Sequence, residues 1–133
     1  MEERIKNFLA GNRFAVAGAS RDRTKYGNKV LRAYQQAGKH VVPINPKVDE
    51  VEGLAAVAEV SELDGSIDGI SIVTPPKITE QIVAAAIDKG IKNVWMQPGA
   101  ESETAVEQAL QAGLNVIHGG PCILVTLRYR EEG

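Results

Sequence analysis

Residues 13–38 read RFAVAGASRDRTKYGNKVLRAYQQAG, and this stretch decides the fold class. Five of its first six residues, from Phe14 to Gly18, are small or apolar, as expected of a buried strand that enters a tight turn. Apolar residues with helical spacing then lead up to a glycine, where a helix would stop: Val30, Leu31, Tyr34, Ala37 and Gly38. The stretch therefore predicts a strand, a loop and a helix in succession.

The same alternation continues along the chain. Apolar and β-branched runs predict strands at 41–44, 69–73, 94–96 and 115–118, and helical spacing predicts helices at about 76–89 and 103–112. A short amphipathic helix is predicted over roughly the first ten residues, and 48–66 fits a short strand, a turn of helix or both. Strands that alternate with helices specify an α/β fold, a Rossmann-like three-layer sandwich with a mostly parallel sheet of five or slightly more strands.

Composition supports one domain over residues 1–133, with a hydrophobic fraction of 44% and a charged fraction of 24%. A formal net charge of -2 argues against nucleic acid or a membrane surface as the partner, because such partners require a broad basic face. Cys122 is the single cysteine, and the N-terminal residues lack the pattern of a signal peptide, so we expect a cytoplasmic protein. Pro43 is awkward inside a strand, because it removes a ladder donor.

The loop after the first strand has the composition of a phosphate-binding loop. Small residues let the backbone approach a ligand, a helix N-terminus favours an anion, and Arg21, Arg23 and Lys25 add positive charge. The competing interpretation is a tight turn followed by a solvated basic loop. The candidate binding residues here are Gly18, Ala19, Ser20, Arg21, Lys25, Tyr26 and Gly27.

The loop after the second strand bears on which nucleotide would bind. A NAD-binding domain normally places an acidic residue here for the ribose hydroxyls, and its first loop reads G-x-G-x-x-G. This chain has Asn45-Pro46-Lys47 instead, and its first loop lacks that spacing. A cation suits an additional phosphate on the nucleotide, so NADP and coenzyme A both qualify. The alternative is an Asn-Pro turn with an exposed lysine.

Proline restricts, and glycine loosens, the backbone of the remaining loops that follow strands. These are 74–76 (Thr-Pro-Pro), 97–99 (Gln-Pro-Gly) and 119–122 (Gly-Gly-Pro-Cys). In an open parallel sheet such loops meet at the carboxyl ends of the strands, where ligands bind, so together they predict a crevice.

Candidate catalytic residues are few. His40 has the position of a solvated surface histidine, and His118 ends the fifth strand with no serine or carboxylate motif that would complete a triad. Cys122 fits a buried structural cysteine better than a redox-active one. Two histidines and one cysteine without paired spacing do not predict a metal site. We therefore expect no catalytic residues and no enzyme activity.

Five segments together resemble the family of coenzyme A-binding Rossmann-like proteins and, more distantly, the coenzyme A-binding domain of the succinyl-CoA synthetase α subunit. They are FAVAGASRDRTKYGNKV (14–30), VVPINPK (41–47), IVTPP (72–76), WMQPGAES (95–102) and HGGPC (118–122). The phosphorylated histidine and the nucleotide-using machinery of the synthetase lie in further domains and a partner subunit. The resemblance therefore implies binding and not ligase activity.

The resemblance also implies roles for individual residues. The loop from Gly18 to Gly27 would hold the phosphates of coenzyme A, and Asn45, Pro46 and Lys47 would meet its adenosine end. The nucleotide would pack against Val73, Thr74 and Pro75, and the pantetheine arm would pass Gln97 and Pro98. The expected function is binding of coenzyme A or an acyl-CoA, in a regulatory or carrier role. The alternatives are an NADP-binding protein and a non-catalytic subunit of an acyl-CoA enzyme.

Overall fold

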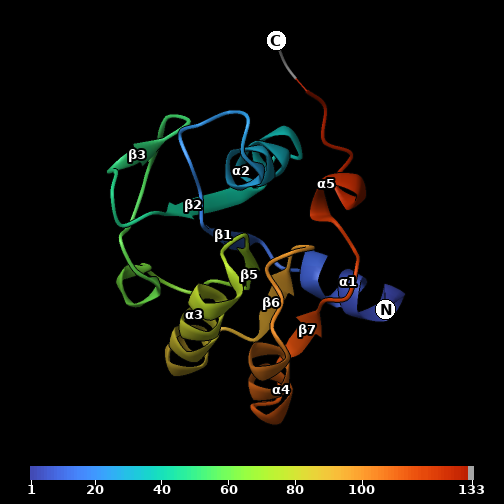
Figure 1. Ribbon diagram of the computed structural model, residues 1–133. Helices are drawn as coiled ribbons and strands as arrows, with labels where there is room; N and C mark the ends of the chain where they lie inside the picture. The colour runs from blue at the N-terminus through green and yellow to red at the C-terminus, as the bar shows by residue number, and fades with distance from the viewer. Residues whose placement is uncertain (132–133) are drawn as a thin grey trace.

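A parallel sheet of five strands forms the centre of the computed structural model, which describes residues 1–131 (Figure 1). The strands follow the order β2-β1-β5-β6-β7 and are β1 (Arg13–Ala17), β2 (His40–Ile44), β5 (Gly69–Ile72), β6 (Asn93–Met96) and β7 (Asn115–Ile117). The helices are α1 (Glu2–Leu9), α2 (Tyr26–Gln36), α3 (Pro76–Lys89), α4 (Glu103–Gln111) and α5 (Ile123–Thr126). This is the predicted Rossmann-like α/β fold.

Both faces of the sheet are buried, which is why its strands lack a polar side. On β1, Phe14 and Val16 face one layer, with α1, α2 and α5, and Ala15 and Ala17 face the other, with α3 and α4. Figure 1 shows α2 on one side of the sheet and α3 with α4 on the other. The alternation along one short strand therefore produces the three layers.

Aromatic side chains fill the layer that contains α1 and α2. The ring centroid of Phe8 lies 5.5 Å from that of Phe14 and 5.4 Å from that of Trp95, and Phe14 lies 5.1 Å from Tyr34. Such spacings are typical of favourable ring pairs. The buried Tyr34 hydroxyl shares a 2.6 Å hydrogen bond with Ser71 Oγ on β5, and burial raises the pKa of this hydroxyl. The pair fastens α2 to the middle of the sheet.

Pro43 is accommodated because β2 is an edge strand. The Pro43 carbonyl accepts a hydrogen bond from Val57 N at 3.1 Å, and Asn45 N donates to the Val57 carbonyl at 2.9 Å. In a strand, the nitrogen and carbonyl of one residue point to the same side, so the missing N–H of Pro43 lies on the outer side of β2 and not toward β1.

The ambiguous segment 48–66 contains a hairpin and a 3₁₀ turn. The hairpin pairs β3 (Glu50–Val51) with β4 (Leu54–Ala55), and η1 (Val60–Glu62) follows it. The helix α5 was not predicted, because four residues are too few to show a periodicity. The fifth strand is one residue shorter than predicted, since β7 ends before His118.

The helix boundaries predicted from caps agree well with the structure. Predicted and observed bounds of α3 coincide, and Gly90 ends it in the left-handed conformation with a φ of 84°. Ser102 caps α4 by accepting a hydrogen bond from Ala105 N at 3.0 Å. Within residues 1–131, no helix is long and apolar enough to cross a membrane.

Asp68 fastens the beginning of β1 to the loop before β5. One of its carboxylate oxygens accepts from Arg13 N at 2.9 Å and from Asn12 N at 2.7 Å. These two backbone hydrogen bonds, that of Arg13 first, lower the pKa of Asp68 below its ordinary value. A carboxylate whose pKa is lower in the folded protein than in the unfolded chain stabilises the folded state. This stabilisation is fully present at pH values above the unfolded pKa, and it is lost as the pH falls through the folded pKa.

We expect Asp68→Asn to lower the free energy of unfolding by about 1 kcal/mol at pH 7, because an amide oxygen accepts these bonds less strongly than a carboxylate. The difference from the wild type should narrow below about pH 4, where Asp68 begins to be protonated in the unfolded chain. Urea unfolding of both proteins at pH 7 and pH 3 measures this difference in the free energy of unfolding. Asp64→Asn, in the same loop, is the control, and a difference that stays constant with pH would contradict the assignment.

Candidate functional site

A cleft of about 780 Å³ opens at the carboxyl ends of β1, β2 and β5. The connection from β1 leads to β2 on one side, whereas β5 lies on its other side, so the chain changes direction across the sheet at this point. Ligands of open α/β sheets bind at such switch points. Ten of the predicted binding residues line the cleft: Gly18, Ala19, Ser20, Lys25, Asn45, Pro46, Lys47, Val73, Thr74 and Pro75.

Gly18 and Gly27 allow the phosphate loop, defined here as residues 18–25, to fold closely between β1 and α2. Gly18 has a φ of 91°, and a Cβ there would overlap the carbonyl of Val73. A Cβ on Gly27 would overlap the carbonyl of Gly18. Glycine is therefore required at both positions by close backbone contact. Gly27 is buried beneath the loop, so it shapes the cleft without lining it.

Two asparagines fix the backbone of the phosphate loop. Asn45 Nδ2 donates to the Ala19 carbonyl at 2.8 Å, and Asn28 Nδ2 donates to the Ser20 carbonyl at 2.8 Å. Because Asn45 follows β2 and Asn28 lies in α2, both neighbours of the loop hold it. The Asn45 carboxamide also accepts from Lys47 N at 2.7 Å, which turns the chain at the predicted Asn-Pro-Lys segment.

The N-terminus of α2 adds positive potential to this edge of the cleft. The backbone N–H groups of Tyr26 and Gly27 donate to no acceptor within residues 1–131, and the first turn of the helix contains no acidic residue. Such free donors, with the helix dipole, favour an anion. Lys25, which precedes the helix, and Lys47 both line the cleft, and they supply two ammonium groups.

The arginines of the phosphate loop bond to the hairpin, and neither lines the cleft, although the sequence predicts that they add charge at this loop. Arg21 Nε donates to the Glu50 carbonyl at 2.8 Å, and the Arg23 guanidinium binds both carboxylate oxygens of Glu52 at 2.7 and 3.2 Å. Arg21 lines a neighbouring hollow of about 580 Å³ that shares Lys47 with the cleft. Lysines, not arginines, are thus the cations of the cleft.

The far end of the cleft is apolar and was missed by sequence reasoning. Ile78, Ile82 and Ala85 of α3 line it opposite Ala58 and Val60. The spacing of Ile78 and Ile82 predicts a core-facing side of α3, yet Ile78 is 40% exposed. The sequence signal was an isoleucine in the first turn of a helix that begins at the carboxyl edge of the sheet. Helical spacing alone does not show whether such a residue faces the core or lines a cleft.

Besides Arg21 and Gly27, three more predicted site residues do not line the cleft. Tyr26 is 63% exposed, and Lys29 Nζ lies 5.9 Å from the centroid of its ring. The Gln97 carboxamide is buried and used internally, since it accepts from Ile123 N at 2.8 Å and donates to Cys122 Sγ at 3.3 Å. Pro98 is exposed beyond the end of β6. Gln97 therefore holds α5 against the sheet in the described structure.

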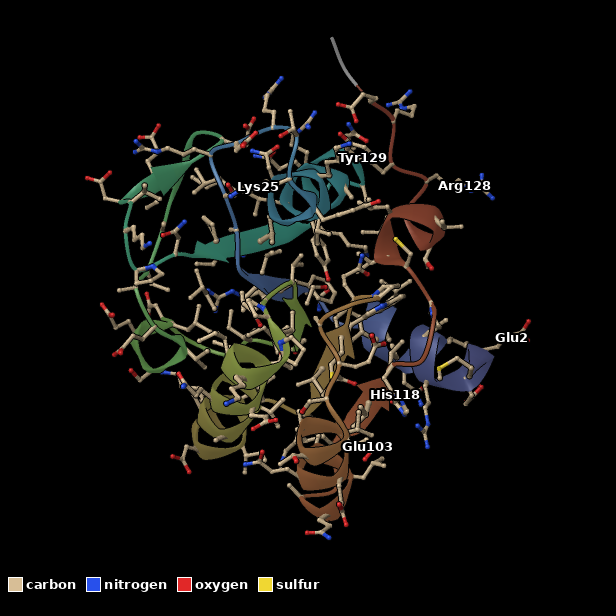
Figure 2. The ribbon with its side chains drawn as sticks, in the orientation of Figure 1. Glu2, Lys25, Glu103, His118, Arg128 and Tyr129 are labelled. Carbon is tan, nitrogen blue, oxygen red and sulfur yellow. The ribbon has the colours of Figure 1, made fainter. Side chains whose placement is uncertain are left out.

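The histidines and the cysteine lie outside the cleft. Figure 2 shows Lys25 at the start of α2 and His118 well apart from it, beyond the end of β7. His118 borders a mainly apolar hollow of about 430 Å³ with Val106 and Leu110. Cys122 is half-buried and accepts the Gln97 hydrogen bond. No histidine or cysteine lines the cleft, and within residues 1–131 no three metal-ligating side chains gather.

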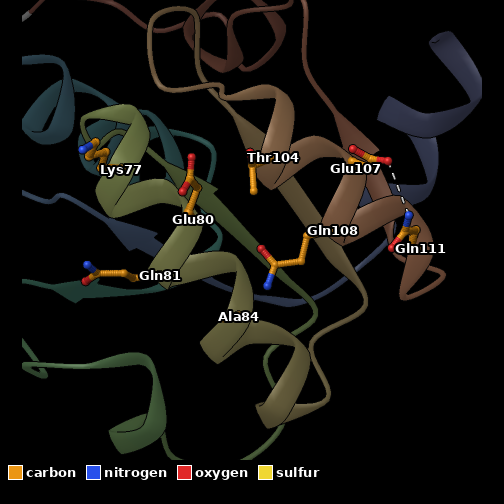
Figure 3. A pocket seen from close by; sticks show the side chains of 8 residues that line it. All are labelled: Lys77, Glu80, Gln81, Ala84, Thr104, Glu107, Gln108 and Gln111. Atoms are coloured by element: carbon orange, nitrogen blue, oxygen red, sulfur yellow. Dashed lines mark hydrogen bonds between the residues drawn. The ribbon is translucent and has the colours of Figure 1, made fainter.

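Another hollow, of about 800 Å³, lies between α3 and α4 (Figure 3). Its walls carry neutral amides and opposed charges, with Gln81 and Lys77 on α3 and Gln108 and Glu107 on α4. It lacks a glycine loop, a free helix N-terminus and converging cations. We therefore place the candidate site in the cleft at β1 and β5, whose basic end suits phosphate groups and whose apolar end suits a flat organic group.

Comparisons with known proteins identify the family of this chain. A family model described as a CoA binding domain matches residues 12–128. The uncharacterized protein YneT of Bacillus subtilis is 30% identical over 114 residues, which cover 85% of this chain and 84% of that protein. The solved structure of a conserved hypothetical protein from Pyrococcus furiosus is 40% identical, with a TM-score of 0.83, and the match covers 87% of this chain and 99% of that one.

A larger enzyme contains the same domain. The α subunit of ADP-forming acetate–CoA ligase II from Pyrococcus furiosus is 38% identical over 96 residues, which cover 70% of this chain but 21% of the subunit. The chain thus spans about a fifth of that relative. Since the matching family model covers nearly all of the described fold and every loop of the cleft, the chain belongs to the family of CoA-binding domains.

Proposed function

We propose that this chain binds coenzyme A or an acyl-CoA in the cleft at β1 and β5, and that it acts as a binding protein and not as an enzyme. The observation that carries the proposal is the meeting of the phosphate loop, the free N-terminus of α2, Lys25 and Lys47 at one end of the cleft. Gly18 and Gly27 let the loop pack closely against the end of β5 and the start of α2, which brings the loop backbone to this end of the cleft.

The proposed pose follows the polarity of the cleft. The phosphates would lie on the loop from Gly18 to Lys25, and the adenosine end would meet Asn45, Pro46 and Lys47. The nucleotide would pack against 73–75 and the apolar side of α3. The pantetheine arm would leave past Pro98, with Gln97 supporting that wall through its bonds to α5.

The comparisons lend no support to the NADP alternative. The relationship to a ligase α subunit does favour a second candidate, in which this chain supplies the coenzyme site to a catalytic partner. Purification of the native protein under mild conditions distinguishes the two, because the second candidate requires a stoichiometric partner. The proposed compartment is the reducing cytoplasm, which suits a protein with one free cysteine.

We expect coenzyme A to bind more tightly than NAD, because Lys47 stands where a dinucleotide domain would place a carboxylate. Titration calorimetry with both ligands at one ionic strength measures this. Dephospho-coenzyme A should bind less tightly than coenzyme A if the additional phosphate meets a cation. Equal or tighter binding of NAD would overturn the proposed ligand.

Lys47→Ala should weaken coenzyme A binding by about 1–3 kcal/mol, the range of a charge-assisted hydrogen bond. The loss should be much smaller with dephospho-coenzyme A, because the additional phosphate is absent. Lys92→Ala, which removes an exposed lysine before β6, is the matched control for net charge. Equal losses with both ligands would show that Lys47 does not contact the additional phosphate.

Ser20→Leu should obstruct the phosphates and weaken binding at least tenfold, while the melting temperature of the ligand-free protein changes little. Ser20 Oγ accepts a 3.1 Å hydrogen bond from Asp22 N, so Ser20→Ala separates the loss of this bond from the added bulk. We expect Ser20→Ala to bind nearly as the wild type does. A large fall in the melting temperature of Ser20→Leu would instead assign Ser20 to packing.

A further inference from the structure

The β3–β4 hairpin forms a firm platform beside the phosphate loop. Val51 is 1% exposed and packs into the same core as α2, and Ala56 N donates to the Asp49 carbonyl at 2.9 Å. Val57, which follows the hairpin, forms a parallel bridge with Ile44 at the end of β2. Both ends of the hairpin are therefore tied to the central fold, and a contact from the hairpin can hold a neighbouring loop in place.

Glu52 occupies the turn of this hairpin in an unfavourable backbone conformation. Its φ is 50°, in the left-handed region that residues other than glycine and asparagine seldom adopt, and Gly53 follows with a φ of 79°. The Glu52 side chain is only 15% exposed. A glutamate held in a costly conformation with its carboxylate largely covered is a candidate for a specific role.

The Glu52 carboxylate meets the phosphate loop at two points. Arg23 of the loop donates to both of its oxygens, at 2.7 and 3.2 Å, in a bidentate pair. Asn28 Nδ2 donates to Glu52 Oε2 at 2.9 Å and to the Ser20 carbonyl at 2.8 Å. Arg32 Nε donates to Asn28 Oδ1 at 2.6 Å, which sets the orientation of the Asn28 amide. One carboxylate thus holds the middle of the loop directly and its beginning through Asn28.

Hydrogen bonds from Arg23 and then Asn28 lower the pKa of Glu52 to about 2. The carboxylate is therefore ionised under any ordinary binding condition. Arg21 adds a further attachment through its bond to the Glu50 carbonyl. The two arginines of the loop bind the hairpin, whereas Lys25 and Lys47 line the cleft.

We propose that Glu52 is a positioning residue that holds the phosphate loop, through Arg23 and Asn28, in the conformation that binds the coenzyme. This inference rests on the proposed function of the cleft. A loop that is already ordered loses little conformational entropy on binding, so a brace outside the cleft raises affinity without touching the ligand. Arg23 acts in this scheme as a partner of Glu52 and not as a ligand of the phosphates.

The test is a double-mutant cycle on the full chain, with coenzyme A affinity measured by titration calorimetry. Glu52→Gln and Arg23→Gln should each raise Kd about tenfold, because each breaks the same pair. The Kd of the double variant should exceed that of the more weakly binding single variant by no more than about twofold, since the Glu52–Arg23 pair can be broken only once. Glu50→Gln, an exposed glutamate in the same hairpin, is the control and should bind as the wild type does.

Two outcomes of the cycle would overturn the inference. If Glu52→Gln keeps the wild-type Kd while Arg23→Gln weakens binding, Arg23 contacts the ligand directly. If the losses add, the two residues act independently. Glu52→Gly guards against a folding defect, because glycine favours the turn while removing the carboxylate. It should weaken binding at least as much as Glu52→Gln, with no fall in melting temperature, and wild-type affinity in this variant would reject the role of the carboxylate.

Hydrogen exchange of the ligand-free protein separates this inference from the proposed function. The amides of residues 19–25 should exchange faster in Glu52→Gln than in the wild type, whereas those of β5 and α3 should be unchanged. Unchanged exchange rates at residues 19–25 would contradict the inference that Glu52 holds the phosphate loop in place. If the wild type fails to bind coenzyme A, the proposed function fails, and the exchange measurement still decides whether Glu52 orders the loop.

Discussion

The close approach of the chain at the ends of β1 and β5 is the constraint on which the shape of the cleft depends. Gly18 turns beneath the Val73 carbonyl with a positive φ, and Gly27 lies against the Gly18 carbonyl. A side chain at position 18 would push the phosphate loop away from the end of β5, and one at position 27 would push it away from α2. The helix N-terminus, the loop and the lysines can then no longer converge, so the geometry of two glycines sets the electrostatics of the cleft.

Charged residues near the cleft have separate tasks. Arginines, whose planar guanidinium groups make bidentate pairs, fasten the phosphate loop to the hairpin, and lysines line the cleft. Helix α2 links the phosphate loop to the core, since Asn28 donates a hydrogen bond to the loop and the Tyr34 hydroxyl shares one with Ser71 on β5. A domain of this kind also matches about a fifth of a ligase α subunit.

Prediction from sequence succeeded where a feature is local and failed where it depends on distant partners. The run RFAVAG and the Pro and Gly boundaries of α3 predict their elements, because strand burial and helix ends follow from adjacent residues. The basic residues of the first loop look alike in sequence. Only Lys25 lines the cleft, because Arg21 and Arg23 find partners about 30 residues away on a hairpin that has no periodicity to reveal it.

By itself, the sequence determined the order of strands and helices, the three layers and the glycine-rich loop at the carboxyl edge, since each of these follows from local periodicity or backbone freedom. Tertiary structure decided which side chains share the cleft. Ile78 became a wall of it, Gln97 was drawn into bonds with α5, and Glu52 was set against the phosphate loop. These outcomes depend on contacts between segments far apart in the chain, and the register and packing that create such contacts are not encoded in any single stretch of residues.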